Sequence, residues 1–162
     1  MVSQNWKVKI LAQLVPYKKK APYYKEVIEL LEKIFSLETE SIVEFNFFSL
    51  KEICNYINIE TPIKIWSEMG VSIDEVNAPD EWALNICKAL KANIYYNPTG
   101  GMSFFDVDKY KRDGVELSFL EYIPTEYKQF STQFVPFLSI IDVMMYNSPD
   151  QIAAFLNNYK LL

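Results

Sequence analysis

Apolar residues in positions 1–60 recur at the spacing of amphipathic helices. Residues 7–14 predict a short helix that stops before Pro16, and Pro22 suits the first turn of a second helix. Ser41, with Glu44 three residues later, is a capping box that opens a third helix. In the second helix one face is apolar, through Tyr24, Val27, Ile28, Leu31, Ile34 and Phe35. Residues 1–60 are therefore expected to form an α-helical pair.

After Pro62 the pattern changes to short apolar segments that alternate with helices. Strands are predicted at 63–66, 94–96 and 115–120, and this alternation is typical of βαβ units with a parallel sheet. The helices between them are expected at about 77–90, capped by Asn77, and at 106–113, ended by Gly114 in the left-handed conformation.

Two further helices are predicted at about 138–146 and 149–159, and Ser148 with Gln151 makes a second capping box. The expected fold class is α/β: a small parallel three-stranded sheet flanked by helices, with an N-terminal helical pair, equivalent to half of a doubly wound, Rossmann-like domain. A single domain is expected over 1–162, with a helical part at 1–60 and a βαβαβ part with the C-terminal helices at 61–162.

The amino-acid composition excludes several catalytic and metal-binding mechanisms. The 162 residues include no histidine, which excludes Ser-His-Asp and Cys-His catalysis and imidazole metal ligands. Cys54 and Cys87 stand alone in helical apolar patterns, so we expect reduced core cysteines. No cofactor and no metal are expected, because there is no CxxC, GxGxxG or P-loop motif.

Charge is unevenly distributed along the chain. Residues 1–25 contain six lysines and no acid, whereas the remainder contains ten basic and twenty-one acidic residues. The lysines indicate either an anionic partner near the N-terminus or a solvated helix end and loop. We expect no nucleic-acid partner, because the chain has a single arginine, Arg112, for bidentate phosphate contacts.

We expect no membrane insertion. The N-terminus lacks the apolar region of a signal peptide, and the most apolar stretch, 134–146, is too short to span a bilayer and is interrupted by Pro136 and Asp142. The expected location is therefore cytoplasmic.

Candidate binding residues follow the predicted strands, because ligands of open α/β sheets gather at the carboxyl ends of the strands. Ser67 and Glu68 follow the first strand, and the segment after Leu120 follows the third. The turn after the second strand is the sharpest candidate, because glycine amides can approach a phosphate or carboxylate closely. It contains Asn97, Thr99, Gly100 and Gly101, residue types that an ordinary turn also uses.

Two pairs of side chains carry alternative interpretations. Ser139 with Asp142 is either a nucleophile and its base or, at i and i+3, the first turn of a helix. Asp106 with Asp108 is either a pair of Mg²⁺ ligands or the acidic start of a helix.

The order of several segments resembles the WbqC-like family. The segments are Asn5-Trp6, the run 19–24, Trp66-Ser67-Glu68-Met69-Gly70, 84–90, 95–101 and, most strongly, 133–142 with the sequence QFVPFLSIID. The resemblance implies a bacterial role in surface-polysaccharide (O-antigen type) biosynthesis, with transfer of an acyl or aminoacyl group to a sugar as one possibility. It also implies a further N-terminal segment of strands, so the chain is expected to be a shortened member.

Together, the turn and the resemblance predict a nucleotide-sugar or acyl ligand at Asn97, Thr99, Gly100 and Gly101, with Ser67, Glu68 and Gln133 nearby. The competing interpretation is a non-catalytic scaffold. It would complete its sheet in a homodimer or with a separately encoded N-terminal half.

Overall fold

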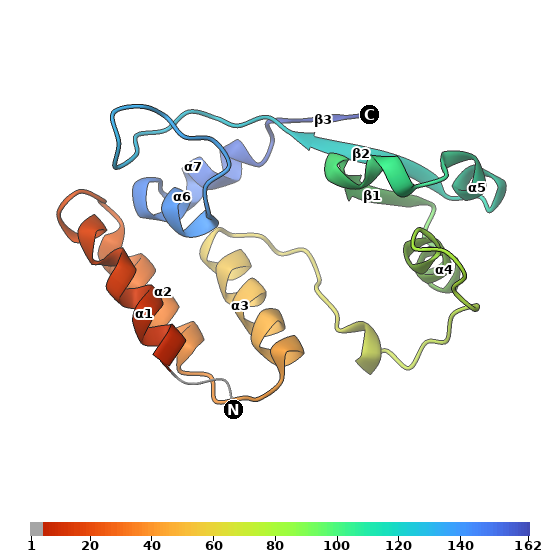
Figure 1. The fold of residues 1–162 in the computed structure, drawn as a ribbon, viewed down its shortest axis with the longest axis horizontal. Coiled ribbons are helices and arrows are strands. Elements are labelled where there is room, and N and C mark those ends of the chain that lie inside the picture. The colour runs from red at the N-terminus through yellow and green to blue at the C-terminus, as the bar shows by residue number, and fades with distance from the viewer. Residues whose placement is uncertain (1–4) are drawn as a thin grey trace. The chain divides into compact units, whose positions relative to one another are not determined.

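The computed structural model describes residues 5–162 and divides them into two compact units (Figure 1). The helical unit comprises the described residues up to 63 together with Pro124–Asn157, and the sheet unit comprises Lys64–Ile123 with Asn158–Leu162. Within residues 5–162, no helix has both the length and the apolarity needed to cross a bilayer.

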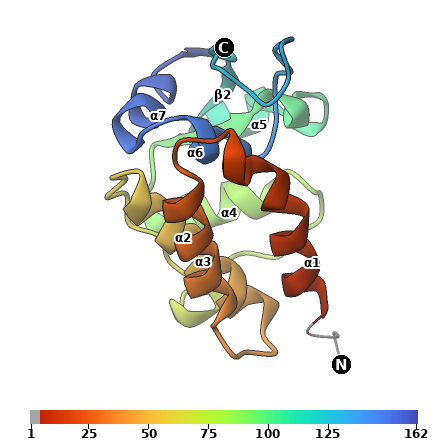
Figure 2. The ribbon, with the colours of Figure 1, turned by 90° about the vertical axis from the view of Figure 1, so that its left-hand side faces the viewer.

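The helical unit confirms the predicted N-terminal helices. Its elements are α1 (Asn5–Leu14), a 3-10 helix (Val15–Lys19), α2 (Tyr24–Phe35), α3 (Ile42–Tyr56), α6 (Ile140–Tyr146) and α7 (Pro149–Phe155). α1, α2 and α3 run side by side (Figures 1 and 2). The Ser41 hydroxyl accepts from the Glu44 amide at the start of α3, and Ser148 and Gln151 form the reciprocal capping box of α7.

The core of the helical unit lies where α2 meets α6 and α7. Val27 and Leu31 of α2 are buried with Met144 and Met145 of α6 and Ile152 of α7. The Tyr23 amide also donates to the Met145 carbonyl over 3.2 Å, which joins the start of α2 to α6. The C-terminal helices are thus packed with the N-terminal ones, although more than a hundred residues separate them in the sequence.

The sheet unit confirms the α/β fold class with three strands. It contains α4 (Glu81–Leu90), β1 (Ile94–Pro98), a 3-10 helix (Thr99–Phe104), α5 (Val107–Arg112), β2 (Glu116–Tyr122) and β3 (Tyr159–Leu161). The strand order is β1-β2-β3, with β1 parallel to β2 and β3 antiparallel to β2. Gly114, at φ +76°, ends α5 as predicted.

The third strand is not the one predicted. Residues 63–65 form no strand and Trp66–Glu68 is a 3-10 helix, so the strand expected at 63–66 is wrong. The C-terminal residues pair with β2 instead, through reciprocal 2.9 Å hydrogen bonds between the backbones of Phe119 and Leu162. The helix expected to reach residue 159 ends at Phe155, and the sheet is mixed rather than wholly parallel.

The helix expected from about Asn77 begins later, at Glu81. The Glu81 carboxylate accepts the backbone N–H groups of Asn77 (2.7 Å) and Ala78 (3.1 Å), so these amides are satisfied by a side chain instead of by a helix turn. Asn77 therefore precedes the helix without capping it.

The sheet unit depends on a buried hydrogen bond made by Tyr110. Its side chain is fully buried, and its hydroxyl donates to the Asp80 carbonyl over 2.7 Å. We expect Tyr110→Phe to lower the free energy of unfolding by about 1–2 kcal/mol, because a buried carbonyl loses its partner. Urea denaturation measures the change. Tyr96→Phe is the control, since Tyr96 is half exposed, and equal stabilities for the two variants would contradict the prediction.

Candidate functional site

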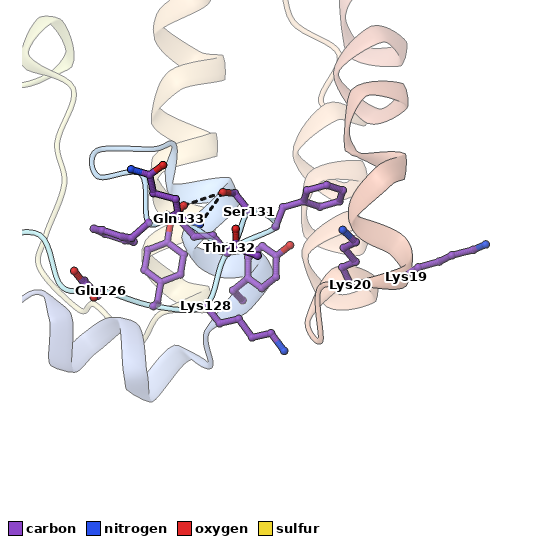
Figure 3. Close-up of a pocket in the computed structure, with 12 residues that line it drawn as sticks. Lys19, Lys20, Glu126, Lys128, Ser131, Thr132 and Gln133 are labelled. Carbon is purple, nitrogen blue, oxygen red and sulfur yellow. Dashed lines mark hydrogen bonds between the residues drawn. The ribbon is translucent and has the colours of Figure 1, made fainter.

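The candidate site is an open hollow of about 1080 Å³ in the helical unit. One wall is the end of the 3-10 helix and the next residue, the other is the loop that enters α6, and Tyr146 of α6 contributes as well (Figure 3). Lys20 points toward the loop, whereas Lys19 extends away from it (Figure 3). The lining residues are Lys19, Lys20, Glu126, Tyr127, Lys128, Gln129, Phe130, Ser131, Thr132, Gln133, Phe134 and Tyr146.

A smaller hollow of about 310 Å³ adjoins the first and shares four of its residues. The shared residues, which we call the lysine junction, are Lys19, Lys20, Lys128 and Tyr146. No carboxylate in residues 5–162 lies within ion-pair distance of these three lysines. Lys20 instead places its ammonium group 3.7 Å from the centre of the Phe130 ring. The junction therefore carries positive charge that the described protein leaves unneutralised.

One buried carboxylate holds both walls of the hollow. Asp142, which is 6% exposed on α6, accepts a 2.7 Å hydrogen bond from the Tyr17 hydroxyl and a 2.6 Å hydrogen bond from the Tyr127 hydroxyl. Tyr17 belongs to the lysine-bearing 3-10 helix, and Tyr127 precedes Lys128 in the loop. Hydrogen bonds to an ionised acceptor are among the strongest in proteins, so the two walls are fixed to α6 at one point.

Local hydrogen bonds shape the loop wall itself. The buried Gln129 amide donates to the carbonyl of Val135 and accepts from its N–H, both over 2.8 Å. Ser131 Oγ donates to the Gln133 carbonyl (2.9 Å) and accepts from the Gln133 amide (3.0 Å), as the dashed lines in Figure 3 mark. These bonds close a short turn that presents Ser131, Thr132 and Gln133 at the hollow.

The three tyrosines near Asp142 stay protonated well above neutral pH. Burial, then the hydrogen bond to Asp142 and its charge, raise the pKa of Tyr17 to about 12. Burial and the same carboxylate raise the pKa of Tyr127 further. Burial and the charge of Asp142 also raise the pKa of Tyr146. At neutral pH these three side chains are therefore uncharged, and their hydroxyl groups can donate hydrogen bonds.

Of the residues predicted from the sequence, Gln133 lies at the hollow. Asn97, Thr99, Gly100 and Gly101 lie in the sheet unit, at the end of β1 and in the 3-10 helix after it. The Asn97 side chain donates to the Pro98 carbonyl (2.8 Å) and accepts from the Tyr95 hydroxyl (3.1 Å). Binding by this turn stays a prediction.

Gly101 has a packing role in that turn. A Cβ atom at Gly101 would lie 2.5 Å from Asn97 Nδ2 and 3.1 Å from the Phe105 ring, whereas one at Gly100 would meet nothing within 4 Å. Gly101 is thus required by close approach of its neighbours. Ser67 and Glu68 are exposed in the 3-10 helix Trp66–Glu68, also in the sheet unit, and their part in binding likewise stays a prediction.

The two ambiguous pairs resolve as helix starts. Ser139 is the N-cap of α6, accepting from the Ile141 amide, and its partner Asp142 is bonded to tyrosines. Asp106 is the N-cap of α5, accepting from the Lys109 amide over 3.0 Å. Residues 5–162 contain no group of three or more cysteine and acidic side chains able to hold a metal ion.

Sequence reasoning did not assign Lys128 or Tyr146 to a site and left the role of Lys19 and Lys20 open. The run of lysines without an acid was the sequence signal for an anion-binding site. Whether these lysines form such a site depends on the residues that face them in the fold. The facing wall is more than a hundred residues away in the chain, so no local pattern could identify it.

The fold and the hollow define an α/β protein with a lysine-lined polar pocket in its helical unit. The model of the WbqC-like protein family matches residues 1–154, and the chain therefore belongs to that family. No curated protein and no solved structure matches the chain significantly.

We expect Asp142→Asn to lower the pKa of Tyr17 from about 12 toward its ordinary value of 10.0, because the variant removes a charge that opposes tyrosinate. The raised folded-state pKa means that the stability contributed by Tyr17 is complete below pH 10 and is lost between pH 10 and 12. The variant should therefore lose less stability than the wild type across this window.

Tyrosinate absorbance during alkaline titration and urea unfolding at both ends of the window measure these effects. Asp150→Asn, which removes an exposed acid from α7, is the matched control. An unchanged tyrosine titration in Asp142→Asn would show that the carboxylate does not govern Tyr17.

Proposed function

We propose that this protein acts in surface-polysaccharide biosynthesis and binds a nucleotide sugar, or a related acyl-bearing ligand, in the hollow of the helical unit. Membership of the WbqC-like protein family supports the polysaccharide role. The observation that carries the ligand class is the pairing of unneutralised lysines with hydrogen-bonding side chains around one hollow.

The lining suits both halves of such a ligand. Ser131, Thr132 and Gln133 offer donors and acceptors of the kind that bind sugar hydroxyls, and Tyr127 and Phe134 offer aromatic surface 5.7 Å apart between ring centres. The lysine side supplies the charge that a phosphate requires. The volume of about 1080 Å³ is slightly larger than that of ordinary small-molecule sites.

In this proposal the hollow binds and orients the ligand, which lies between the lysine wall and the Ser131–Gln133 turn. The positions of both walls depend on Asp142, which makes that carboxylate a positioning residue.

Calorimetric titration of the full chain with UDP-glucose tests the proposal, and acetyl-CoA tests the acyl alternative. We expect saturable binding that weakens by about fivefold in Lys20→Gln and Lys128→Gln and weakens further with added salt, because the ammonium groups are exposed and screened. Lys25→Gln, which removes a charge of the same N-terminal run outside the hollow, should bind like the wild type.

Two results would overturn this assignment. One is the absence of binding by nucleotide sugars and acyl ligands alike. The other is a loss of binding in Gly100→Ala with full binding in both lysine variants, which would return the site to the Asn97–Gly101 turn. The added methyl group in Gly100→Ala meets no neighbour, so the variant leaves the packing of that turn intact.

The scaffold function remains a second candidate because of the sheet. Among the described residues, β1 pairs with β2 alone, and its Ile94 and Tyr96 side chains are about half exposed. A second copy or another chain that completed the sheet would cover this edge. If the protein is a scaffold that pairs with itself, light scattering should give the mass of a dimer. A monomer mass at all concentrations would exclude the homodimer.

A further inference from the structure

Tyr146 presents a buried polar atom without a partner. Its side chain is 8% exposed, and its hydroxyl makes no hydrogen bond with any of residues 5–162. A buried hydroxyl that gives up water without a replacement bond is unfavourable by about 1–3 kcal/mol. The other two tyrosines of this cluster, Tyr17 and Tyr127, both donate to Asp142.

The position of Tyr146 indicates what the missing partner is. Both hollows include Tyr146, and the other three residues that they share are all lysines. Because the raised pKa keeps the tyrosine neutral, its hydroxyl can donate a hydrogen bond, and the lysines that line both hollows with it carry ammonium donors. A group that carries negative charge and several acceptor oxygens is the best match for the ammonium groups of Lys20 and Lys128 and for this hydroxyl.

We propose that the lysine junction is a phosphate-binding subsite, in which Lys20 and Lys128 neutralise the phosphate and the Tyr146 hydroxyl donates a hydrogen bond to one of its oxygens. This assignment rests on the proposed function, since it names the part of the hollow that takes the phosphate of the ligand. It leaves the Ser131–Gln133 side for the sugar.

Packed aromatic rings hold parts of this subsite in place. Tyr17 lies 5.9 Å from Tyr146 and 6.0 Å from Phe130, measured between ring centres, and Lys20 is held over Phe130. Tyr17 is itself fixed by Asp142. The Tyr146 ring and the Lys20 ammonium group are thus connected through the packed rings of Tyr17 and Phe130 before any ligand binds.

The test uses inorganic pyrophosphate and UDP-glucose as probes of the full-length Tyr146→Phe variant. Without a probe we expect its melting temperature to equal or exceed that of the wild type, because the substitution removes an unsatisfied hydroxyl and keeps the ring. Its affinity for both probes should fall about tenfold, the loss of one hydrogen bond to a charged group. Tyr110→Phe, which removes a bonded hydroxyl, should show the opposite pattern of lower stability and unchanged affinity.

Equal affinity of Tyr146→Phe and wild type for pyrophosphate would overturn the subsite, as would a lower melting temperature of the variant without a probe. Binding of the wild type to glucose but not to pyrophosphate would also overturn it, while leaving a sugar-binding function. Binding to pyrophosphate with no preference for UDP-glucose over UDP would instead support the subsite and contradict the proposed nucleotide-sugar ligand.

Discussion

The hollow depends on the buried carboxylate of Asp142 and the two tyrosine hydroxyls that satisfy it. Tyr17 and Tyr127 come from segments 110 residues apart, and each bonds one oxygen of the same side chain. A buried charge that loses a partner is strongly unfavourable, so neither segment can leave α6 without exposing or orphaning that carboxylate. Lys20 and Lys128 belong to the two segments that this carboxylate joins, since each lysine lies within three residues of one of the tyrosines.

Local chemistry in the sequence accounts for most helices. Ser41, Ser148 and Gly114 mark helix ends because their side chain, or the lack of one, satisfies a requirement of the terminal backbone. The third strand could not be predicted in this way. Ile63 and Ile65 alternate as a strand would, but pairing depends on which segment reaches the free edge of β2, and Tyr159–Leu161 occupies it.

In the candidate site, too, the sequence predicts local features but not the contacts between distant segments. The glycines at 100 and 101 look alike in the sequence, yet a Cβ at one would clash with Asn97 and a Cβ at the other would meet empty space. The sequence pattern correctly places Asp142 in the first turn of α6. The pattern does not indicate its tyrosine partners, because they lie on other segments of the chain. Gln133 was found because it belongs to the strongest family segment, whereas Tyr146 lies just beyond that segment.

The buried charge of Asp142 is joined through Tyr17 to a lysine run that contains no acid. The Asp142 carboxylate repels an anion in the hollow, and its charge contributes, after burial, to the raised pKa of Tyr146. An acid near Lys18–Lys20 would add to this repulsion and would pair with the ammonium groups. Residues 1–25 contain no acid, and among residues 5–162 no carboxylate lies within ion-pair distance of Lys19 or Lys20. Structural anchoring and anion binding thus use opposite charges within one small cluster, separated by the neutral hydroxyls of three tyrosines.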